Sequence, residues 1–364
     1  MNVLFYYGSV YNGGAEKVIT ALANHMSSNG DGVQIVVTDD GKCGYDLSDA
    51  VRVVPLNSVL QRKNRFDSVK NFFGTLKSLR KRIKEFKPDV IVSFDPRYAF
   101  LAKLSCGKNC RRVVGSERSN PFAARKSAAD KLFVKLSVFL NGFIFQTNGA
   151  RSFYPEKTRK KSVVISNGVF EEIPASGVGF RERSRFGICA SGRLSQVKRY
   201  DLMIRAVKEL SAKYPDIELD IFGDGGDRQK IADMINEYHL EGKVVLKGRT
   251  MRIYDELLKY RYFLLTSDSE GMPNGLIDAM ACGCVCVCSD CDFGPSELIR
   301  DGENGFLVPT GSFEKVAEKL EQLFETDDGE LAGISDRASD IRVSLSKEKI
   351  VGSYYEYIKE IAKR

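Results

Sequence analysis

Two stretches in the second half of the sequence combine cations, carboxylates and glycines at spacings that suit a phosphorylated ligand. In the first, Gly192 and Arg193 follow a short apolar run, and Lys198 lies five residues after Arg193 at the expected start of a helix. Arginine can bind phosphate oxygens through two parallel hydrogen bonds, and lysine supplies a point charge. This spacing suits a diphosphate, although a pair of solvated surface charges would also explain it.

The second stretch, residues 267–283, is the densest in the chain. Glu270 lies in a loop of Gly, Pro and Asn residues after an apolar run, and Asp278 lies inside the helix that follows. Amide groups at a helix start can bind phosphate or sugar oxygens, and carboxylates accept hydrogen bonds from sugar and ribose hydroxyls. Glu270 could instead cap the helix and Asp278 could be a solvated charge. The order of strand, loop and acid-bearing helix favours ligand binding.

A glycine pair near the N-terminus offers a weaker phosphate site. Gly13 and Gly14 follow the first apolar run and open a helix that carries Glu16 in its first turn. Such a turn lets the backbone approach a ligand at a helix N-terminus, but a plain tight turn has the same residues. Neither this turn nor the loop at 192–198 matches the fingerprints G-x-G-x-x-G or G-x-x-x-x-G-K-[ST], which disfavours a dehydrogenase or an ATPase.

Short Val-, Ile- and Phe-rich runs alternate with helical patterns throughout, which predicts parallel sheets covered by helices. We expect strands at 2–7, 33–38, 89–94, 111–115, 142–145, 161–165, 186–190, 217–222, 243–247, 262–266, 284–288 and 305–308. We expect helices near 14–29, 68–87, 123–141, 198–213, 227–238, 275–282, 312–325 and 347–364.

The pattern restarts after a stretch rich in helix and strand breakers, which predicts two doubly wound α/β domains. The expected domains are 1–170 and 186–345, joined by a linker at 171–185 and followed by a C-terminal helix at 346–364 that could pack on either one. Ligands bind at the carboxyl ends of strands in such sheets, so two sheets that face each other would share one cleft.

Charge is unevenly divided along the 364 residues: the net charge of +7 combines +13 in residues 1–180 with −6 in residues 181–364. A basic half indicates an anionic partner, either nucleic acid or a membrane surface. The absence of tryptophan and of an aromatic-basic motif disfavours nucleic acid. Residues 61–87 combine an apolar stripe at helical spacing, which can pack on the sheet, with basic residues that we expect to dock on an anionic membrane. The basic residues are Arg62, Lys63, Arg65, Lys70, Lys77, Arg80, Lys81, Arg82, Lys84 and Lys87.

No apolar run reaches the about 20 residues of a membrane-spanning helix, and the N-terminus has no signal-peptide pattern. We therefore expect a cytoplasmic protein, peripheral at the inner face of the cell membrane.

Cys282, Cys284, Cys286 and Cys288 alternate with other residues and lack the C-x2-C spacing of zinc sites. This alternation predicts a buried strand with its thiols on one face.

The second half resembles family 4 of the retaining glycosyltransferases, enzymes of the GT-B fold with two Rossmann-like domains. The stretches that carry this resemblance are Gly192-Arg193 with Lys198, and 221–225, 244–248, 270–274, 278–283 and 301–309. The first half resembles the branch that acts on polyprenyl-linked saccharides. Its matching stretches are 13–16, 88–94 and 116–121.

The resemblance implies a role for each matching residue. Arg193, Lys198 and Glu270 would be catalytic: the two cations would neutralise the diphosphate leaving group, and Glu270 would contact the transferred sugar. The donor would also contact Gly13, Gly14, Gly248, Arg249, Gly271, Met272, Pro273, Asn274, Gly275 and Asp278. Candidates for the acceptor side or the cleft are Glu16, Asp95, Glu117 and Arg118.

Two positions depart from the family pattern. The second acid of the E-x7-E motif is Asp278, one methylene shorter than Glu, so it would reach less far towards the ribose diol. Arg118 stands where the family often has a catalytic histidine, and the only histidines are His25, inside an expected helix, and His239, in an expected loop. A mechanism based on histidine is therefore disfavoured.

The function that follows is transfer of a hexose or N-acetylhexosamine, with retention, from a UDP-sugar to a lipid-linked saccharide. Charge stabilisation of the departing diphosphate would drive the reaction, with no metal ion and no other cofactor. Two alternatives remain at this point: a nucleotide-sugar epimerase of the same fold, and a sugar-binding protein without activity.

Overall fold

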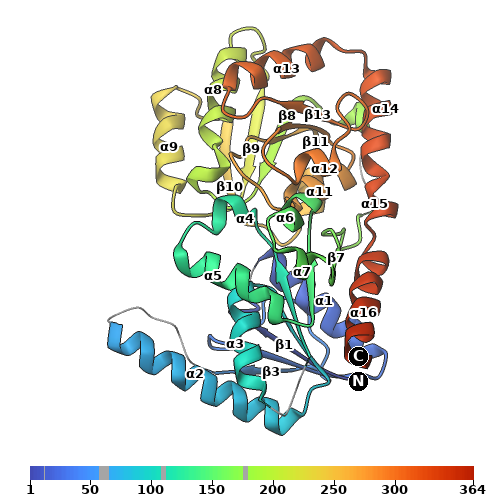
Figure 1. Cartoon of the computed structure of the whole chain (residues 1–364). Coiled ribbons are helices and arrows are strands. Elements are labelled where there is room, and N and C mark those ends of the chain that lie inside the picture. The colour runs from blue at the N-terminus through green and yellow to red at the C-terminus, as the bar shows by residue number, and fades with distance from the viewer. Residues whose placement is uncertain (12, 57–64, 108–111, 175–178) are drawn as a thin grey trace. The chain divides into compact units, whose positions relative to one another are not determined.

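The computed structural model divides the chain into two compact units (Figure 1). The N-terminal unit comprises Met1–Phe170 and Lys347–Arg364, and the C-terminal unit comprises Glu171–Ser346. The structure describes residues 1–364 except 12, 57–64, 108–111 and 175–178, and it does not describe the side chains of residues 65–70.

A seven-stranded sheet, parallel throughout, forms the centre of the N-terminal unit, in the order β3-β2-β1-β4-β5-β6-β7. Its strands are β1 (Asn2–Tyr7), β2 (Gly32–Val37), β3 (Arg52–Pro55), β4 (Val90–Ser93), β5 (Val113–Glu117), β6 (Gly142–Phe145) and β7 (Ser162–Val164). Side chains alternate between the faces of each strand. Leu4 and Tyr6 of β1 point to one face, where they pack with Leu79 and Ile83.

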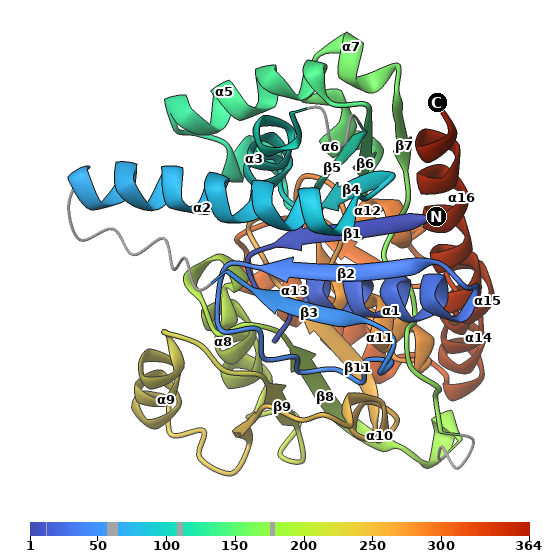
Figure 2. The ribbon, with the colours of Figure 1, turned by 90° about the horizontal axis from the view of Figure 1, so that it is seen from below.

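Helices cover the sheet of the N-terminal unit. They are α1 (Gly14–Ser28), α2 (Arg65–Phe86), α3 (Pro96–Cys106), α4 (Pro121–Ala124), α5 (Ala128–Leu136), the 3-10 turn η1 (Ser137–Phe139), α6 (Asn148–Ser152), α7 (Glu156–Arg159) and α16 (Lys347–Lys363). The C-terminal helix α16 packs beside α1 and contacts β4 (Figure 2). The end of the chain is thus part of the N-terminal unit.

The C-terminal unit has a six-stranded parallel sheet in the order β10-β9-β8-β11-β12-β13. Its strands are β8 (Ser184–Ser191), β9 (Glu218–Phe222), β10 (Val244–Gly248), β11 (Tyr260–Leu265), β12 (Val285–Ser289) and β13 (Phe306–Val308). The other elements are η2 (Phe180–Glu182), η3 (Gln196–Lys198), α8 (Tyr200–Leu210), α9 (Arg228–Glu237), α10 (Ile253–Leu257), α11 (Asn274–Ala281), α12 (Pro295–Leu298), α13 (Phe313–Glu325), α14 (Asp328–Ser339) and α15 (Ile341–Ser344).

Every strand expected from the sequence is present within a few residues, which confirms the two parallel α/β sheets. The sequence did not predict the edge strand β3, because its four residues include Arg52 and end in a proline. The expected helix at 123–141 is wrong: α4 ends at Ala124 and α5 starts anew at Ala128. Ser127 causes this break, since its side chain caps α5 by accepting a hydrogen bond from the Asp130 amide.

The four alternating cysteines differ from the expectation that they share one strand. All four thiols are buried, as expected, but they do not share a strand. Cys282 ends α11, Cys284 lies before β12, and only Cys286 and Cys288 belong to that strand. The thiols therefore fill the core as small apolar groups in a helix, a turn and a strand.

None of the helices in the described ranges has the length and apolar character needed to cross a membrane.

Candidate functional site

The strand order of the C-terminal sheet reverses between β8 and β11. The chain runs outward from β8 through β9 to the edge strand β10, and then returns to β11 and continues through β12 to β13. Ligands of doubly wound sheets bind beside the carboxyl ends of the strands at such a switch point. The two chemistry-bearing stretches follow these two strands: 192–198 follows β8, and 267–270 follows β11.

The loop that follows β8 is fixed by contacts with the loop that follows β9. A Cβ atom on Gly223 would lie 1.9 Å from the Gly192 carbonyl oxygen, so only glycine permits this approach. Leu194 is buried, and its amide donates to the Asp224 carbonyl oxygen at 3.0 Å. Arg193 is exposed between these anchors, and within the described residues it has no hydrogen-bond or ion-pair partner. Its guanidinium can therefore approach a ligand.

Lys198 and Glu270 meet across the switch point. The Lys198 ammonium donates to Glu270 Oε1 at 2.5 Å, and the Ser267 hydroxyl donates to the same oxygen at 2.5 Å. The side chains of Lys198 and Glu270 are only 20% and 10% exposed. The pair thus places a cation and a carboxylate, both partly desolvated, side by side where a ligand of this fold binds.

Helix α11 begins against the end of β8. A Cβ atom on Gly275 would lie 2.6 Å from the Ser191 hydroxyl oxygen and 2.9 Å from the Ser191 carbonyl oxygen. The glycine therefore lets the N-terminus of α11 approach the switch point, where a helix start favours an anion. Pro273 occupies the N-cap and supplies no side-chain hydrogen bond to the helix.

The carboxylate of Asp278 is held by a tyrosine that the sequence did not single out. Tyr254, a buried residue of α10, donates from its hydroxyl to Asp278 Oδ1 at 2.7 Å. Burial first, and then the Asp278 carboxylate, raise the pKa of Tyr254 well above its usual value, so the phenol stays protonated and remains a donor. The shortened acid is therefore fixed in place rather than solvated.

The other residues expected to bind the donor lie at the end of β10, in the loop after β11 and at the start of α11. Gly248 and Arg249 lie at the end of the edge strand β10, and β9 separates them from β8. Arg249 is exposed, whereas Met272 and Pro273 are buried. Gly271 packs against the backbone of the next loop, because a Cβ atom on Gly294 would lie 2.5 Å from its carbonyl oxygen. Asn274 is the first residue of α11.

The glycine turn of the N-terminal unit follows β1, beside the switch point between β1 and β4. The Gly13 amide donates to the Tyr45 hydroxyl at 3.2 Å. A Cβ atom on Gly13 would lie 2.4 Å from Glu16 Oε2, so the Glu16 carboxylate lies over this glycine. The Glu16 carboxylate thus lies beside the start of α1 at Gly14, and the phosphate contact expected of Gly13 and Gly14 stays a prediction.

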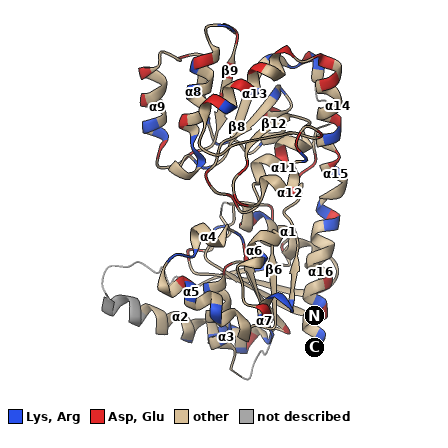
Figure 3. Ribbon diagram, turned by 45° about the horizontal axis from the view of Figure 1, so that its top comes forward, with Lys and Arg blue, Asp and Glu red and all other residues tan. Residues whose placement is uncertain are grey.

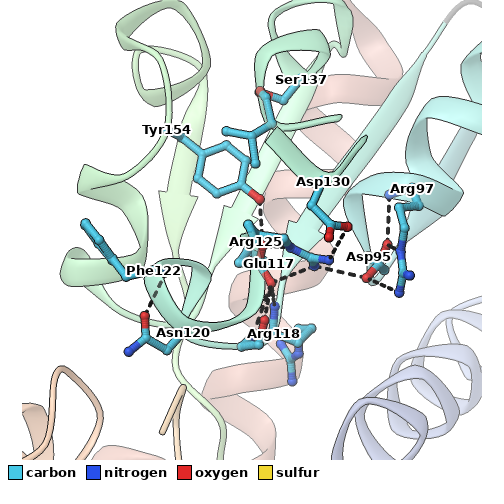
Figure 4. Close-up of polar contacts among 12 residues, drawn as sticks. Asp95, Arg97, Glu117, Arg118, Asn120, Phe122, Arg125, Asp130, Ser137 and Tyr154 are labelled. Carbon is cyan, nitrogen blue, oxygen red and sulfur yellow. Dashed lines mark hydrogen bonds and ion pairs between the residues drawn. The ribbon is translucent and has the colours of Figure 1, made fainter. Parts of the chain in front are cut away.

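Asp95 and Glu117, both expected on the acceptor side, belong to one buried ion network (Figure 4). Arg125 donates to Glu117 from Nε at 2.9 Å and from Nη2 at 3.0 Å, and its Nη2 also donates to Asp95 at 3.0 Å. The Tyr154 hydroxyl completes the cluster at 2.7 Å from Glu117 Oε2. Since the Glu117 side chain is 0% exposed, it is a structural residue and cannot contact an acceptor.

Asp95 has a second structural task, because its side chain caps the N-terminus of α3. Burial alone would raise the pKa of this carboxyl group, but the guanidinium groups of Arg97 and Arg125 hold it below its ordinary value. Asp95 is therefore a charged cap at neutral pH.

Arg118 stands at the position where the resemblance led us to expect a histidine. Its side chain contacts three separate segments of the N-terminal unit. It donates to the Tyr354 hydroxyl of α16 and to Asn167 Oδ1, each at 2.5 Å, and its guanidinium lies 5.1 Å from the centre of the Phe94 ring. Arg118 thus ties the end of β5 to the segments at which the chain leaves and re-enters the unit.

The histidines and possible metal ligands give no further site. His25 lies in α1 with its ring centre 5.4 Å from that of Tyr355, and His239 is exposed after α9. Within the described residues, no group of three or more His, Cys, Asp or Glu side chains has the geometry of a metal site. Sequence reasoning missed Ser267 and Tyr254, whose roles become visible only through their contacts with Glu270 and Asp278.

Two protein families match adjacent parts of the chain. The family described as Glycosyltransferase Family 4 matches residues 12–172, and the family described as Glycosyl transferases group 1 matches residues 179–338. The second match contains all six strands of the C-terminal sheet, and the first contains the strands of the N-terminal sheet except β1.

Two curated relatives agree with these matches. An uncharacterized glycosyltransferase of Haemophilus influenzae is 22% identical over 340 residues, which are 93% of this chain and 94% of the relative. The N-acetylgalactosamine-N,N'-diacetylbacillosaminyl-diphospho-undecaprenol 4-alpha-N-acetylgalactosaminyltransferase of Campylobacter jejuni is 32% identical over 171 residues, 47% of this chain and 46% of the relative.

The fold has solved counterparts. The Anabaena protein HepE, crystallised with UDP and glucose, is 19% identical and superimposes with a TM-score of 0.81 over 99% of both chains. The fold is therefore that of the GT-B enzymes, and the two halves of the chain match two families of glycosyltransferases, Glycosyltransferase Family 4 and Glycosyl transferases group 1.

Proposed function

We propose that the chain transfers a hexose or N-acetylhexosamine, with retention of configuration, from a UDP-sugar to a lipid-linked saccharide. The observation that carries this proposal is the pairing of Lys198 with Glu270 at the switch point of the C-terminal sheet. A cation for the diphosphate and a carboxylate for the sugar are both needed there. The UDP and glucose bound to the related fold of HepE, and the diphospho-undecaprenol in the name of the Campylobacter relative, support this choice of donor and acceptor.

In the proposed reaction, the bond between the anomeric carbon and the β-phosphate oxygen breaks first. Arg193, Lys198 and the N-terminus of α11 stabilise the negative charge of the departing UDP. The acceptor hydroxyl then attacks the oxocarbenium-like sugar from the same face, and its proton passes to the departing phosphate. Glu270 accepts hydrogen bonds from the sugar hydroxyls, and Asp278, oriented by Tyr254, accepts them from the ribose diol. No step needs a histidine or a metal ion.

An assay with radiolabelled UDP-sugars and a lipid extract tests the proposal. We expect label to move from UDP to the lipid fraction, at the same rate with and without EDTA, because side chains rather than a metal neutralise the diphosphate. Interconversion of UDP-sugars without transfer would indicate the epimerase alternative, and binding without turnover would indicate a binding protein. Loss of activity in EDTA, restored by Mn²⁺ or Mg²⁺, would contradict metal independence.

A lipid-linked acceptor requires access to a membrane, and we propose that α2 provides it. Its apolar stripe packs into the core through Leu79 and Ile83, whereas its lysines after Lys70 are exposed. Figure 3 marks the Lys and Arg positions of the chain in blue. Lys77, Lys84 and Lys87 are exposed and have no ion-pair partner among the described residues. Arg62 and Lys63 lie outside the described residues, as do the side chains of Arg65 and Lys70.

Exposed apolar side chains of the same unit support a bilayer as the partner. Phe73 of α2 is 63% exposed, Leu132 of α5 is 53% exposed and Phe139 of η1 is 64% exposed. Helix α3 packs against both α2 and α5, so these residues lie on neighbouring elements. Exposed apolar side chains and exposed lysines together suit the interface between headgroups and acyl chains of an anionic membrane.

Vesicle sedimentation tests this docking. Replacing Lys77, Lys81, Lys84 and Lys87 by Gln is expected to weaken binding to anionic vesicles by about 4 kcal/mol, or roughly 1,000-fold, at about 1 kcal/mol per residue. Arg80 stays in place because it donates to the carbonyl oxygens of Leu104 and Ser105. The matched control replaces four exposed lysines of the C-terminal unit, Lys208, Lys213, Lys259 and Lys315, and should bind like the wild type. Equal losses in both variants, or no binding by the wild type at low salt, would rule out docking through α2.

A further inference from the structure

Arg199 has an unusual backbone conformation beside the proposed catalytic lysine. Its φ and ψ angles are +49° and +47°, the left-handed region that residues with a Cβ atom rarely adopt. It lies where η3 ends and α8 begins, directly after Lys198. A non-glycine residue stays in this region only when the surrounding contacts hold it there.

The side chain of Arg199 bridges two elements. Its Nε and Nη2 donate to the two carboxylate oxygens of Asp201, each at 3.0 Å, and its Nη1 donates to Asp268 Oδ1 at 3.1 Å. Asp201 lies in the first turn of α8, whereas Asp268 lies in the loop after β11, two residues before Glu270. The guanidinium therefore links the element that carries Lys198 to the loop that carries Glu270.

Backbone contacts complete the link on both sides of Lys198. The Asp268 amide donates to the Val197 carbonyl oxygen at 2.8 Å, and the Thr266 hydroxyl donates to the Arg199 carbonyl oxygen at 2.8 Å. The residue before Lys198 and the residue after it are thus both fastened to the segment that precedes Glu270. Such contacts fix the position of the backbone from which the Lys198 side chain extends.

We infer that Arg199 is a positioning residue, which holds Lys198 in register with the Glu270 loop through its ion pair with Asp268. This inference rests on the proposed role of Lys198 in stabilising the departing diphosphate. The side chains of Arg199 and Asp268 are 27% and 43% exposed, and they border a cavity of about 460 Å³. An ion pair so open to water contributes little to the free energy of unfolding. Its loss should therefore change the position of Lys198 rather than the stability of the protein.

The test uses two variants that break the bridge in different ways. Asp268→Asn removes one charge and keeps the pair between Arg199 and Asp201, whereas Arg199→Gly permits the left-handed backbone and removes the bridge. Each is expected to lower kcat about tenfold, because a displaced Lys198 no longer meets the charge of the transition state. The donor KM should change less than about twofold and the melting temperature by less than about 2 °C.

A matched control comes from another cation with two acidic partners. Lys213, beyond the far end of α8, donates to Glu321 at 2.7 Å and to Glu325 at 2.6 Å. Glu321→Gln therefore breaks an exposed ion pair of the same kind away from the site, and it should leave both kcat and KM unchanged.

A double-mutant cycle shows whether Arg199 acts through Lys198. If it does, Asp268→Asn causes no further loss when Lys198 is already alanine. A full additional tenfold loss in that background would overturn the inference, and so would a wild-type kcat in Asp268→Asn. The proposed function fails separately, if Lys198→Ala itself retains the wild-type kcat/KM.

Discussion

Replacing Arg193 by alanine is expected to lower kcat/KM about 100-fold or more while leaving the melting temperature unchanged. Arg193 is exposed and has no hydrogen-bond or ion-pair partner within the described residues, so its removal breaks no such contact among them. Any loss of activity must then come from an interaction with the substrate or the transition state. A lost donor to a developing charge costs a factor of about 100 to 1,000 in kcat. Steady-state kinetics with the UDP-sugar, together with thermal unfolding, provide the measurement.

Lys198→Ala should lose activity to a similar degree but also some stability, because it leaves the Glu270 carboxylate without its cation. Ser267 still donates to that carboxylate, which limits the cost. The comparison separates the two cations: we propose that both act on the leaving group, but only Lys198 also pairs with a residue of the loop after β11. Lys208→Ala, an exposed lysine of α8, is the control and should behave like the wild type. Wild-type kcat/KM in both Arg193→Ala and Lys198→Ala would remove them from the catalytic site.

The sheets could be predicted from the sequence because most strands are continuous runs of Val, Ile and Phe between breakers. Elements whose residues follow no such pattern were missed. Helix α3 is one of them, although Asp95-Pro96 is a cap followed by a proline at the first helical position, a recognised start signal. The edge strand β3 had too few residues to show any alternation.

The C-terminal part of the site could be placed because its signals are local. A strand, a glycine loop and a helix start follow one another within each stretch, and the fold brings the carboxyl ends of β8 and β11 together. The contacts themselves could not be predicted. Lys198 and Glu270 are 72 residues apart, and nothing in either stretch indicates that Tyr254 orients Asp278.

Glu117 shows why an acidic residue after a strand is not enough to assign a site. Its position at the end of β5 resembles that of Glu270, which follows β11. The difference lies in Arg125, whose guanidinium returns from the loop between α4 and α5 to occupy both oxygens of Glu117. A sequence shows that an arginine follows, but only the fold shows that it points inward.

Arg125→Met should therefore be among the most destabilising substitutions in the N-terminal unit. The Arg125 and Glu117 side chains are 8% and 0% exposed, and the variant leaves two carboxylates near each other with little water. Breaking a buried pair by removing one partner costs about 3–5 kcal/mol of unfolding free energy. Arg97→Met is the matched control: Arg97 also pairs with Asp95, but its side chain is 52% exposed, so its loss should cost less than about 1 kcal/mol. Urea denaturation of both variants measures the difference.

The pH dependence of this loss distinguishes a buried charge from a simple packing defect. In the wild type, the lowered pKa of Asp95 means that its stabilisation is present at neutral pH and is lost as the pH falls below about 4. In Arg125→Met the change of stability with pH has the opposite direction. The uncompensated negative charge is relieved when the folded protein takes up a proton, so the deficit should shrink as the pH falls from neutral towards the ordinary carboxyl pKa of about 4. A deficit that stays constant over this range would mean that Arg125 stabilises the unit through packing rather than through its charge.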